Sequence, residues 1–425
     1  MILNSPIYPE ATSVAVSKST ELIERMCKRI KMLDSHIGLF FLTHYTSAPR
    51  LNYLLRTAPL YLEPEFMQNI DTTVRETAIS VTNVAMDNSA WSQASLPVRY
   101  GGLGLRSVAS LALPCYLSSA HKALSTVKSI IKHPNLQKLQ QLNHAESHFQ
   151  GLHPHTALPN GEAALRQKSW DELTCKAVFN NLTSTANQVH SARLLAAAAP
   201  HSGAWLQALP CPTLGLHLDE ETTRIAVALR VGAQICEPHR CRCGSLVDTL
   251  GHHGLSCGKS AGRNPRHHYL NDVVKRSLHS AGIPSWLEPV GLDRGDGKRP
   301  DGLTCLPFTN GKNLCWDATC TDTFCKSAIA QTALTAGAAA NKAEGRKTTL
   351  YSSLSDRYRF EPLAIETTGV LGNTSARFVA EIGRRITLKT GEKRETAWLR
   401  QRLSIAVVRG NAASILATGK SFGVD

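Results

Sequence analysis

The feature that most constrains the fold is a change of pattern near residue 286 of this 425-residue chain. Short apolar runs there alternate with turns rich in Gly, Asp, Asn and Lys; the runs cover 286–292, 302–308 and 314–320. Such runs predict β-strands, and the Asn310-Gly311 pair predicts a hairpin turn. Residues 359–367 predict a further strand. Helical patterns surround these strands, so this part of the chain is expected to be an α/β domain.

The rest of the chain is dominated by helical spacing of apolar residues. Residues 18–33 and 66–86 each place apolar side chains on one helical face. The paired glycines at 101–102 predict a turn, and Ser107 is a suitable cap for the helix that follows. Further helices are expected over residues 221–233, 265–281, 326–354, 374–387 and 394–419.

The predicted fold class is therefore multidomain, with an all-α N-terminal region and an α/β C-terminal domain. The expected segments are a helical region over 1–130, a helical linker region over 131–220, a helix with a Cys/His segment over 221–282, and the α/β domain with basic C-terminal helices over 283–425.

Composition indicates the class of partner and the cellular compartment of the protein. The net charge of +14 favours a polyanionic partner, most often nucleic acid. No stretch approaches the roughly 20 apolar residues that a membrane span needs, and the N-terminus lacks a secretory signal pattern. The 12 cysteines are irregularly spaced, which favours a reducing compartment. We therefore expect an intracellular protein with no membrane partner.

A Cys/His segment precedes the strands. Cys241, Cys243 and Cys257, with His252 or His253, form a set of thiolate and imidazole ligands of the kind that close a structural zinc site. The spacing does not decide between the two histidines. Cys236 and His239 also lie close enough in sequence to substitute, and the alternative is a set of free cysteines in a turn.

Three carboxylates lie in or beside the predicted strands: Glu288, Asp301 and Asp317. Carboxylates that are held together repel each other unless a cation or a proton joins them, and Mg²⁺ or Mn²⁺ is the usual reason to gather oxygen ligands. A nuclease of the restriction type would also use a lysine to orient the attacking water. Thr319 stands where that lysine is usual, so Lys342 or Lys347 on the next helix is expected to take the role.

Basic residues mark the end of the chain. Arg384, Arg385, Arg400 and Arg402 are interleaved with apolar residues, and Arg299 lies beside the acids. These arginines are candidate contacts to nucleic-acid phosphates. The alternative is a solvated face of amphipathic helices.

Several of these segments resemble a known family. The stretches RTAPLYLEPEFMQNIDTTVRETAISV and WSQASLPVRYGGLGLRSVASLALPCYLSSA resemble the thumb and connecting region of retrotransposon reverse transcriptases. CRCGSLVDTLGHHGLSCG followed by RHHYLNDVVKRSL resembles the Cys/His motif of non-LTR-like elements. EPVGLDRGDGKRPDG, LCWDATCTDTF, AEGRK and FEPLAIETTG resemble the restriction-like endonuclease that follows that motif. The resemblance covers about residues 20–125 and 220–415.

The resemblance implies a nuclear DNA endonuclease that nicks its target so that the element can integrate. It implies metal binding by Asp301 and Asp317, an accessory role for Glu288, and Lys347 as the catalytic lysine. Glu366 would lie on a neighbouring strand. It also implies structural zinc held by Cys241, Cys243, His253 and Cys257, which lie in the Cys/His segment described above.

The chain departs from the family in one respect. The Tyr/Phe-x-Asp-Asp turn that holds metal in the polymerase palm does not occur in it. We therefore expect no polymerase activity from this chain, which resembles a part that follows the palm. DNA is the expected partner, and element RNA and a palm from a longer product are further partners that the resemblance suggests. Two alternatives remain: a non-catalytic, zinc-dependent nucleic-acid-binding protein, and an inactive remnant.

Overall fold

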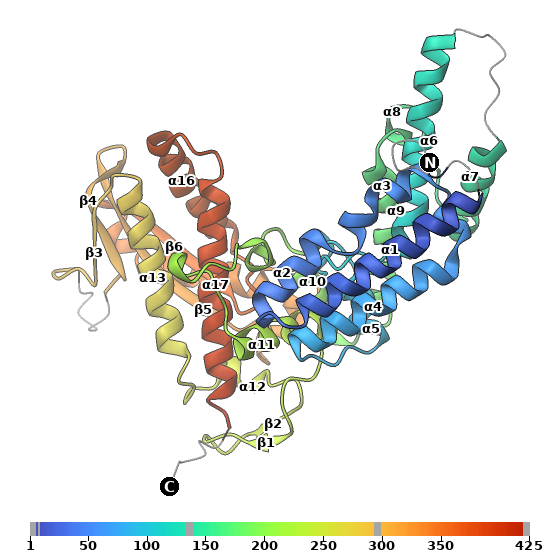
Figure 1. Ribbon diagram of the computed structural model, residues 1–425. Coiled ribbons are helices and arrows are strands. Elements are labelled where there is room, and N and C mark those ends of the chain that lie inside the picture. The colour runs from blue at the N-terminus through green and yellow to red at the C-terminus, as the bar shows by residue number, and fades with distance from the viewer. Residues whose placement is uncertain (1–5, 7–8, 132–139, 293–298, 420–425) are drawn as a thin grey trace. The chain divides into compact units, whose positions relative to one another are not determined.

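The computed structural model describes residues 6, 9–131, 140–292 and 299–419 (Figure 1). The chain forms two compact units, Met1–Thr185 and Ala186–Asp425. The four predicted segments are finer than this division, and their boundaries at 130, 220 and 282 stay a prediction. The predicted turn around 295–298 lies outside the described residues.

The described part of the N-terminal unit is built from helices. They are α1 (Pro9–Ile30), α2 (Ser35–Tyr45), α3 (Ala48–Thr57), η1 (Leu60–Leu62), α4 (Pro64–Thr82), α5 (Asn88–Ala94), η2 (Val98–Tyr100), α6 (Val108–Ile131), α7 (Gln140–Leu152), α8 (Gly161–Ala164) and α9 (Gln167–Ser184). The predicted periodic segments correspond to α1 and α4, and Ile23 and Ile70 from these helices are fully buried. The expectation of a largely helical N-terminal region is confirmed.

The paired-glycine turn joins α5 to α6 through close backbone packing. A Cβ atom on Gly102 would lie 1.9 Å from the Leu96 carbonyl oxygen, so only glycine fits there. Ser107 then caps α6 as predicted, because its Oγ accepts a hydrogen bond from the Ser110 amide at 3.1 Å. Asp71 supports the same helix end by accepting a hydrogen bond from the Val108 amide at 2.7 Å.

The C-terminal unit combines helices with a sheet. Its helices are α10 (Gln188–Ala198), η3 (Ala204–Gln207), η4 (Pro212–Leu214), α11 (Glu220–Val231), α12 (His253–Ser256), α13 (Arg263–Ser280), α14 (Ile329–Thr332), α15 (Ala338–Leu350), η5 (Ser352–Leu354), α16 (Asn373–Thr390) and α17 (Glu395–Leu416). Its strands are β1 (His239–Arg240), β2 (Leu246–Val247), β3 (Ser285–Leu287), β4 (Gly302–Thr309), β5 (Lys312–Thr321) and β6 (Tyr358–Glu366).

The main sheet has four strands in the order β3-β4-β5-β6. The first two pairings are antiparallel, and β6 runs parallel to β5. The Asn310-Gly311 hairpin is confirmed: Thr309 pairs with Lys312, and both turn residues have positive φ, 50° and 74°. The C-terminal unit is thus a mixed sheet packed with helices, as the α/β prediction expected.

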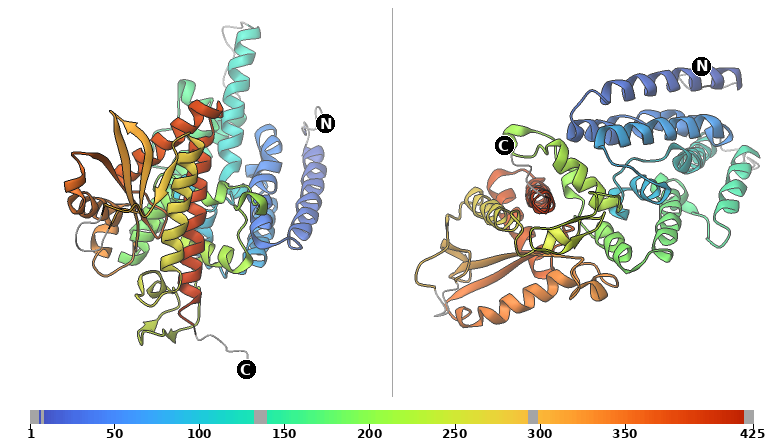
Figure 2. Two further views of the ribbon diagram at one scale, coloured as in Figure 1. Left: turned by 90° about the vertical axis from the view of Figure 1, so that its left-hand side faces the viewer. Right: turned by 90° about the horizontal axis from the view of Figure 1, so that it is seen from below.

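Helices cover both faces of this sheet (Figures 1 and 2). Leu363 and Ile365 of β6 point into a large core shared with α13, α16 and α17. Ala364 lies between them on the strand and packs instead against Ala340 and Ala343 of α15. Figure 2 shows α15, in orange, across the sheet from yellow α13 and red α17. Alternate residues of β5 and β6 therefore face either the large core or α15.

The single helix predicted over 326–354 is wrong. The chain forms α14 and α15 there, separated by a break in which Gly337 has a φ of 80°. The Glu366 carboxylate explains where α15 begins. Its Oε1 accepts hydrogen bonds from the Ala339 and Ala340 amides at 3.0 and 3.3 Å. A high alanine content predicted helix throughout, but this buried acid fixes a new N-terminus.

Among the residues that the structure describes, no helix combines the length and the apolar character needed to cross a membrane.

Candidate functional site

Asp301 and Asp317 come from the neighbouring strands β4 and β5. Gly302 pairs with Trp316 in the antiparallel ladder, and the Asp301 amide donates to the Trp316 carbonyl at 2.9 Å. Extending this register by one residue places Asp301 opposite Asp317. The Ala318 amide donates to Asp301 Oδ2 at 2.6 Å and fixes that side chain. Backbone pairing therefore brings two carboxylates from different strands together.

Lys347 completes the group from helix α15. Its Nζ atom lies 2.6 Å from Asp317 Oδ1. Lys342, the other lysine that the sequence suggested, is exposed and does not line the site. Thr319, two residues after Asp317, stands where a restriction-type strand would usually carry its lysine. The ammonium group thus comes from the face of the sheet that α15 covers, at one of the two predicted positions.

Glu288 lies at the same edge, but its carboxylate is paired with a cation. Its amide donates to the Asp301 carbonyl at 2.8 Å, and its backbone has a φ of 51°. Its side chain, which is 59 % exposed, forms an ion pair with Arg299. The Arg299 carbonyl in turn accepts a hydrogen bond from the Tyr351 hydroxyl at 2.9 Å. Glu288 is therefore near the two aspartates, with its charge directed to Arg299.

His267 is a member of this group that the sequence analysis did not identify. Its Nε2 lies 3.1 Å from Asp301 Oδ1 and 3.2 Å from Asn271 Nδ2. Asn271 is held by the Trp316 indole, whose Nε1 donates to Asn271 Oδ1 at 3.0 Å. The hydrogen bond to Asp301 raises the pKa of His267 above its usual value. The one available signal was the i, i+4 spacing of His267 and Asn271 on the predicted helix.

The electrostatics of the pair favour a cation. The Asp317 side chain is only 4 % exposed. Burial raises its pKa, and the neighbouring Asp301 carboxylate raises it further, while Lys347 opposes both effects. Oxygen ligands from adjacent strands are the donor set that Mg²⁺ and Mn²⁺ accept. The chemistry of these residues therefore fits a hard divalent cation between Asp301 and Asp317.

These side chains line one open cleft of about 350 Å³. The lining residues are His267, Glu288, Arg299, Pro300, Asp301, Asp317, Lys347, Leu350 and Tyr351. Because the cleft opens to solvent, a large substrate can approach the aspartates. All four predicted catalytic residues, Glu288, Asp301, Asp317 and Lys347, are thus placed together.

Most of the predicted nucleic-acid-binding arginines lie elsewhere. Only Arg299 of that set lines the cleft among the described residues. Arg384 and Arg385 both form ion pairs with Glu381 on α16, at 2.9 and 2.7 Å. Arg400 is half-buried, which lowers its pKa, and Arg402 is exposed. These two arginines therefore share one acid on their own helix, which offsets one of their two charges.

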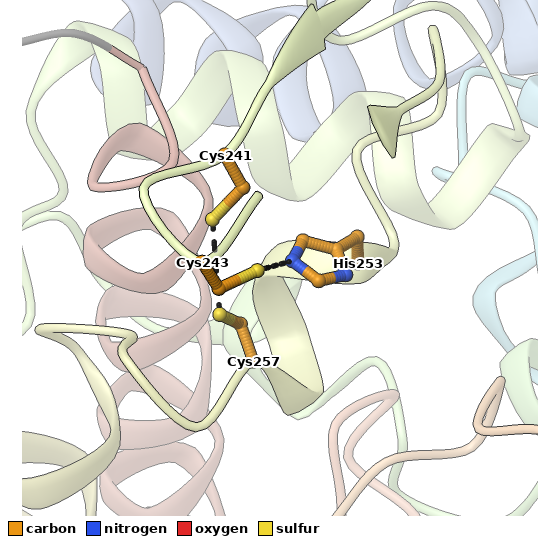
Figure 3. A group of neighbouring side chains, drawn as sticks. All are labelled: Cys241, Cys243, His253 and Cys257. Atoms are coloured by element: carbon orange, nitrogen blue, oxygen red, sulfur yellow. Dashed lines mark hydrogen bonds between the residues drawn. The ribbon is translucent and has the colours of Figure 1, made fainter. Parts of the chain in front are cut away.

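A second candidate site lies in the Cys/His segment (Figure 3). The ligand atoms of Cys241, Cys243, His253 and Cys257 all lie within 4.8 Å of one another. Cys241 and Cys257 sulfurs are 3.7 Å apart, and His253 Nε2 is 3.2 Å from the Cys243 sulfur. Three thiolates and one imidazole match the ligand set of a tetrahedral structural zinc site. This cluster could bind a metal such as zinc.

The local structure shows which of the candidate residues belong to the metal cluster. His252 stacks on Phe324 with ring centroids 4.0 Å apart, and its burial lowers its pKa to about 4. His253 begins α12 and points its Nε2 at the sulfurs. Cys236 donates to the Asp248 carbonyl, and His239 Nε2 contacts Thr418 Oγ1 at 3.0 Å. Of the ligands that the sequence left open, His253 therefore belongs to the cluster, and Cys236 and His239 lie outside it.

The Cys/His segment is packed tightly on α17. A Cβ atom on Gly254 would lie 2.9 Å from Ile415 Cα, and one on Gly262 would lie 2.4 Å from the Ser414 amide nitrogen. Leu255 is buried between these glycines. A metal held by the four ligands would therefore also anchor the last turns of α17.

Comparison with known proteins adds no assignment, because no protein-family model matches the chain and no curated protein matches it in sequence.

Proposed function

We propose that the C-terminal unit is a metal-dependent DNA endonuclease from a retroelement of the non-LTR type. The observation that carries the proposal is the grouping of Asp301, Asp317 and Lys347 in an open cleft. Two carboxylates from adjacent strands with a nearby lysine are the parts that hydrolysis of a phosphodiester requires. The proposed class of reaction follows from that grouping, and the retroelement origin rests on the sequence resemblance.

Each residue of the cleft has its own role in the proposed reaction. Asp301 and Asp317 would hold Mg²⁺ or Mn²⁺, which when bound supplies a Lewis acid for the scissile phosphate. Lys347 orients the attacking water and offsets charge that develops on the phosphate. His267 and the Ala318 amide fix the Asp301 carboxylate. Glu288 and Arg299 form the rim of the cleft, where Arg299 can contact a phosphate of the substrate.

The proposed setting follows from the resemblance. The endonuclease would nick target DNA in the nucleus for integration of the element. The Cys3His cluster would hold structural zinc next to this domain. Element RNA, and a polymerase palm supplied by a longer product, are further proposed partners. The net charge of +14 supports a nucleic-acid partner.

Nicking of supercoiled plasmid tests the proposal. The full chain with Mg²⁺ or Mn²⁺ should convert supercoiled DNA to open circles, and EDTA should stop the reaction. Conversion that continues at the same rate in EDTA would contradict a metal-dependent mechanism.

A second candidate function is zinc-dependent nucleic-acid binding without cleavage. The observation that favours it is the Lys347–Asp317 ion pair, which neutralises part of the acidic pair without a metal. This function predicts salt-dependent DNA or RNA binding and no nicking at any Mg²⁺ concentration. A protein that neither binds nor nicks would match the inactive-remnant alternative.

A further inference from the structure

One large aromatic side chain is exposed on the sheet that carries the two aspartates. The chain has six tryptophans, all of which the structure describes, and only Trp286 is exposed. It lies on β3, an edge strand of the main sheet (Figure 1), and its side chain and backbone together are 62 % exposed. An exposed apolar residue is common by itself, so the place of this indole relative to the cleft decides what it can bind.

The strand register places Trp286 on the cleft face of the sheet. Trp286 pairs with Leu303 of β4, and Leu303 pairs with Cys315 of β5. Residues that pair in a ladder share a face, and residues two apart on one strand share it too. Asp301 precedes Leu303 by two residues, and Asp317 follows Cys315 by two. Trp286 therefore lies on the face that carries both aspartates, in the next row of the ladder.

Strand geometry gives the separation between the indole and the acidic pair. Neighbouring strands lie about 4.8 Å apart and two residues span roughly 6.7 Å, so Trp286 lies roughly 10 Å along the sheet from the midpoint of the two aspartates. A stacked nucleic-acid strand advances about 3.4 Å per base, so this separation equals about three nucleotides. A base close to the scissile phosphate can thus reach the indole.

The cleft face is covered on one side and open on the other. Ala364 of β6 packs against Ala340 of α15. Phe360 of β6 packs against Tyr351, which lines the cleft, with ring centroids 4.8 Å apart. Over β3, by contrast, Trp286 is exposed. A nucleic-acid strand bound at the aspartates therefore has a path across β4 and β3, where it meets the indole.

The chemistry of Trp286 fits a base better than a phosphate. An indole carries no charge to pair with a phosphate, but every base has a π face, and stacking on an aromatic side chain strengthens binding by roughly 5- to 150-fold per base. Inside a duplex each base is already paired and stacked between its neighbours. The indole can therefore stack only on a base that has left the duplex or was never paired.

We infer that Trp286 stacks on an unpaired base of the DNA strand that occupies the cleft. The inference rests on the proposed endonuclease function and names the substrate class of the same site: DNA that is single-stranded or locally unpaired beside the scissile phosphate. Negative supercoiling favours local unpairing, so supercoiled plasmid belongs to this class.

Tryptophan fluorescence of the full chain tests the inference without cleavage, with Ca²⁺ in place of Mg²⁺. A short single-stranded oligothymidylate should quench the emission as it binds, because Trp286 is the exposed tryptophan. An abasic strand of the same length carries the same phosphates and no bases, so it should leave the emission unchanged. No quenching by oligothymidylate, or equal quenching by the abasic strand, would overturn the inference.

Matched variants locate the contact. Trp286→Ala should lose the quenching and bind oligothymidylate at least about fivefold more weakly, whereas Trp286→Phe should keep most of the affinity. Leu287→Ala is the control on the same strand and should bind as the wild type does. Leu287 pairs with Gly302, which lies against Trp316 of the large core on the opposite face. Unchanged affinity in Trp286→Ala would overturn the inference.

The salt dependence of binding separates stacking from phosphate contacts. The wild type and Trp286→Ala should show the same slope of log affinity against log salt concentration, because an indole neutralises no phosphate. A smaller slope in the variant would assign its loss of affinity to displaced cations and would overturn the inference. So would a dimer that Trp286→Ala dissociates in sedimentation, since the indole would then be covered by a second copy.

Nicking rates distinguish this inference from the proposed function itself. With Mg²⁺, a linear duplex that contains a short run of mismatches should be nicked faster than a fully paired duplex, and Trp286→Ala should reduce the difference. Equal rates on both duplexes would overturn the inference and leave the endonuclease proposal intact. If neither duplex nor supercoiled plasmid is nicked, the endonuclease proposal fails, and the fluorescence titration still decides whether Trp286 binds a base.

Discussion

Lys347 Nζ lies 2.6 Å from Asp317 Oδ1, so helix α15 supplies to strand β5 the cation that the strand itself lacks at Thr319. The position of α15 is set in turn by Glu366, which binds the first amides of that helix. The candidate site thus depends on a buried acid that is not part of the cleft lining. This relationship connects the helix break at Gly337 with the placement of the lysine.

Replacement of Asp317 by Asn should abolish nicking with little loss of stability. Burial raises the pKa of Asp317, so its charged form is disfavoured in the folded protein. Asn removes that charge and keeps the shape, while Lys347 is 28 % exposed and can be hydrated. We expect the free energy of unfolding to fall by no more than about 1 kcal/mol, and the nicking rate to fall at least 100-fold. Urea unfolding measures the change in stability, and plasmid assays measure the nicking rate. An Asp317→Asn variant that still nicks at the wild-type rate would show that Asp317 has no role in cleavage.

The zinc content of the purified protein and its variants tests whether the Cys3His cluster binds metal. The wild-type protein should carry one zinc per chain, and Cys241→Ser or His253→Phe should lose it. Loss of a structural zinc removes folding energy; a loss of about 3 kcal/mol lowers the unfolding temperature of a unit this size by roughly 6–12 °C. Elemental analysis and thermal unfolding provide the measurements.

Two variants outside the cluster are the controls for that experiment. Cys236→Ser should keep the zinc, because Cys236 bonds to the Asp248 carbonyl. His252→Phe should keep it too, since an aromatic ring preserves the stack on Phe324. Zinc lost from His252→Phe and retained in His253→Phe would reverse the assignment of the histidine ligand.

Replacement of Glu366 by Ala should destabilise the C-terminal unit and displace Lys347. Its carboxylate accepts hydrogen bonds from the Ala339 and Ala340 amides and from the Thr323 hydroxyl, at 3.0, 3.3 and 2.9 Å. Leaving these buried donors without an acceptor should cost about 3 kcal/mol. Glu366→Gln keeps an acceptor and should lose less than half as much. Equal losses in the two variants, measured by urea unfolding, would show that the amides of α15 do not depend on this oxygen.

Replacement of Gly102 by Ala should destabilise the N-terminal unit by about 3 kcal/mol, because the new Cβ would overlap the Leu96 carbonyl. Gly151 in α7 is the matched control. A Cβ atom there meets nothing within 4 Å, and Ala is the better helix former by about 1 kcal/mol. Gly151→Ala should therefore be neutral or stabilising. Unfolding curves that shift equally for both variants would refute the close packing of the glycine turn.

Features set by neighbouring residues could be predicted from the sequence. The Asn310-Gly311 turn, the cap at Ser107 and the strands β4, β5 and β6 follow from local chemistry, and the structure contains them. The run predicted over 286–292 is a strand only at its start, because β3 ends at Leu287 and Glu288 has a positive φ of 51°. The acids were likewise recognisable, because each lies in or beside a strand-like run.

Features set by distant residues could not be predicted in the same way. The break at Gly337 depends on Glu366, which comes from a strand later in the chain. His267 joins Asp301 only because α13 packs against β5, where Trp316 holds Asn271. Arg193 of α10 donates to the Arg230 carbonyl of α11 at 2.7 Å, a contact that also requires two helices to meet. In each case the partner is chosen by tertiary packing, which local patterns do not encode.

The central claim is that Asp301, Asp317 and Lys347 form one hydrolytic site. Its most direct test compares Lys347→Met with Lys342→Met in Mg²⁺-dependent nicking of supercoiled plasmid, since both lysines lie on α15 and only Lys347 reaches Asp317. We expect at least a 100-fold lower rate for Lys347→Met and a wild-type rate for Lys342→Met. Equal rates in the two variants, or no nicking by the wild type, would contradict it.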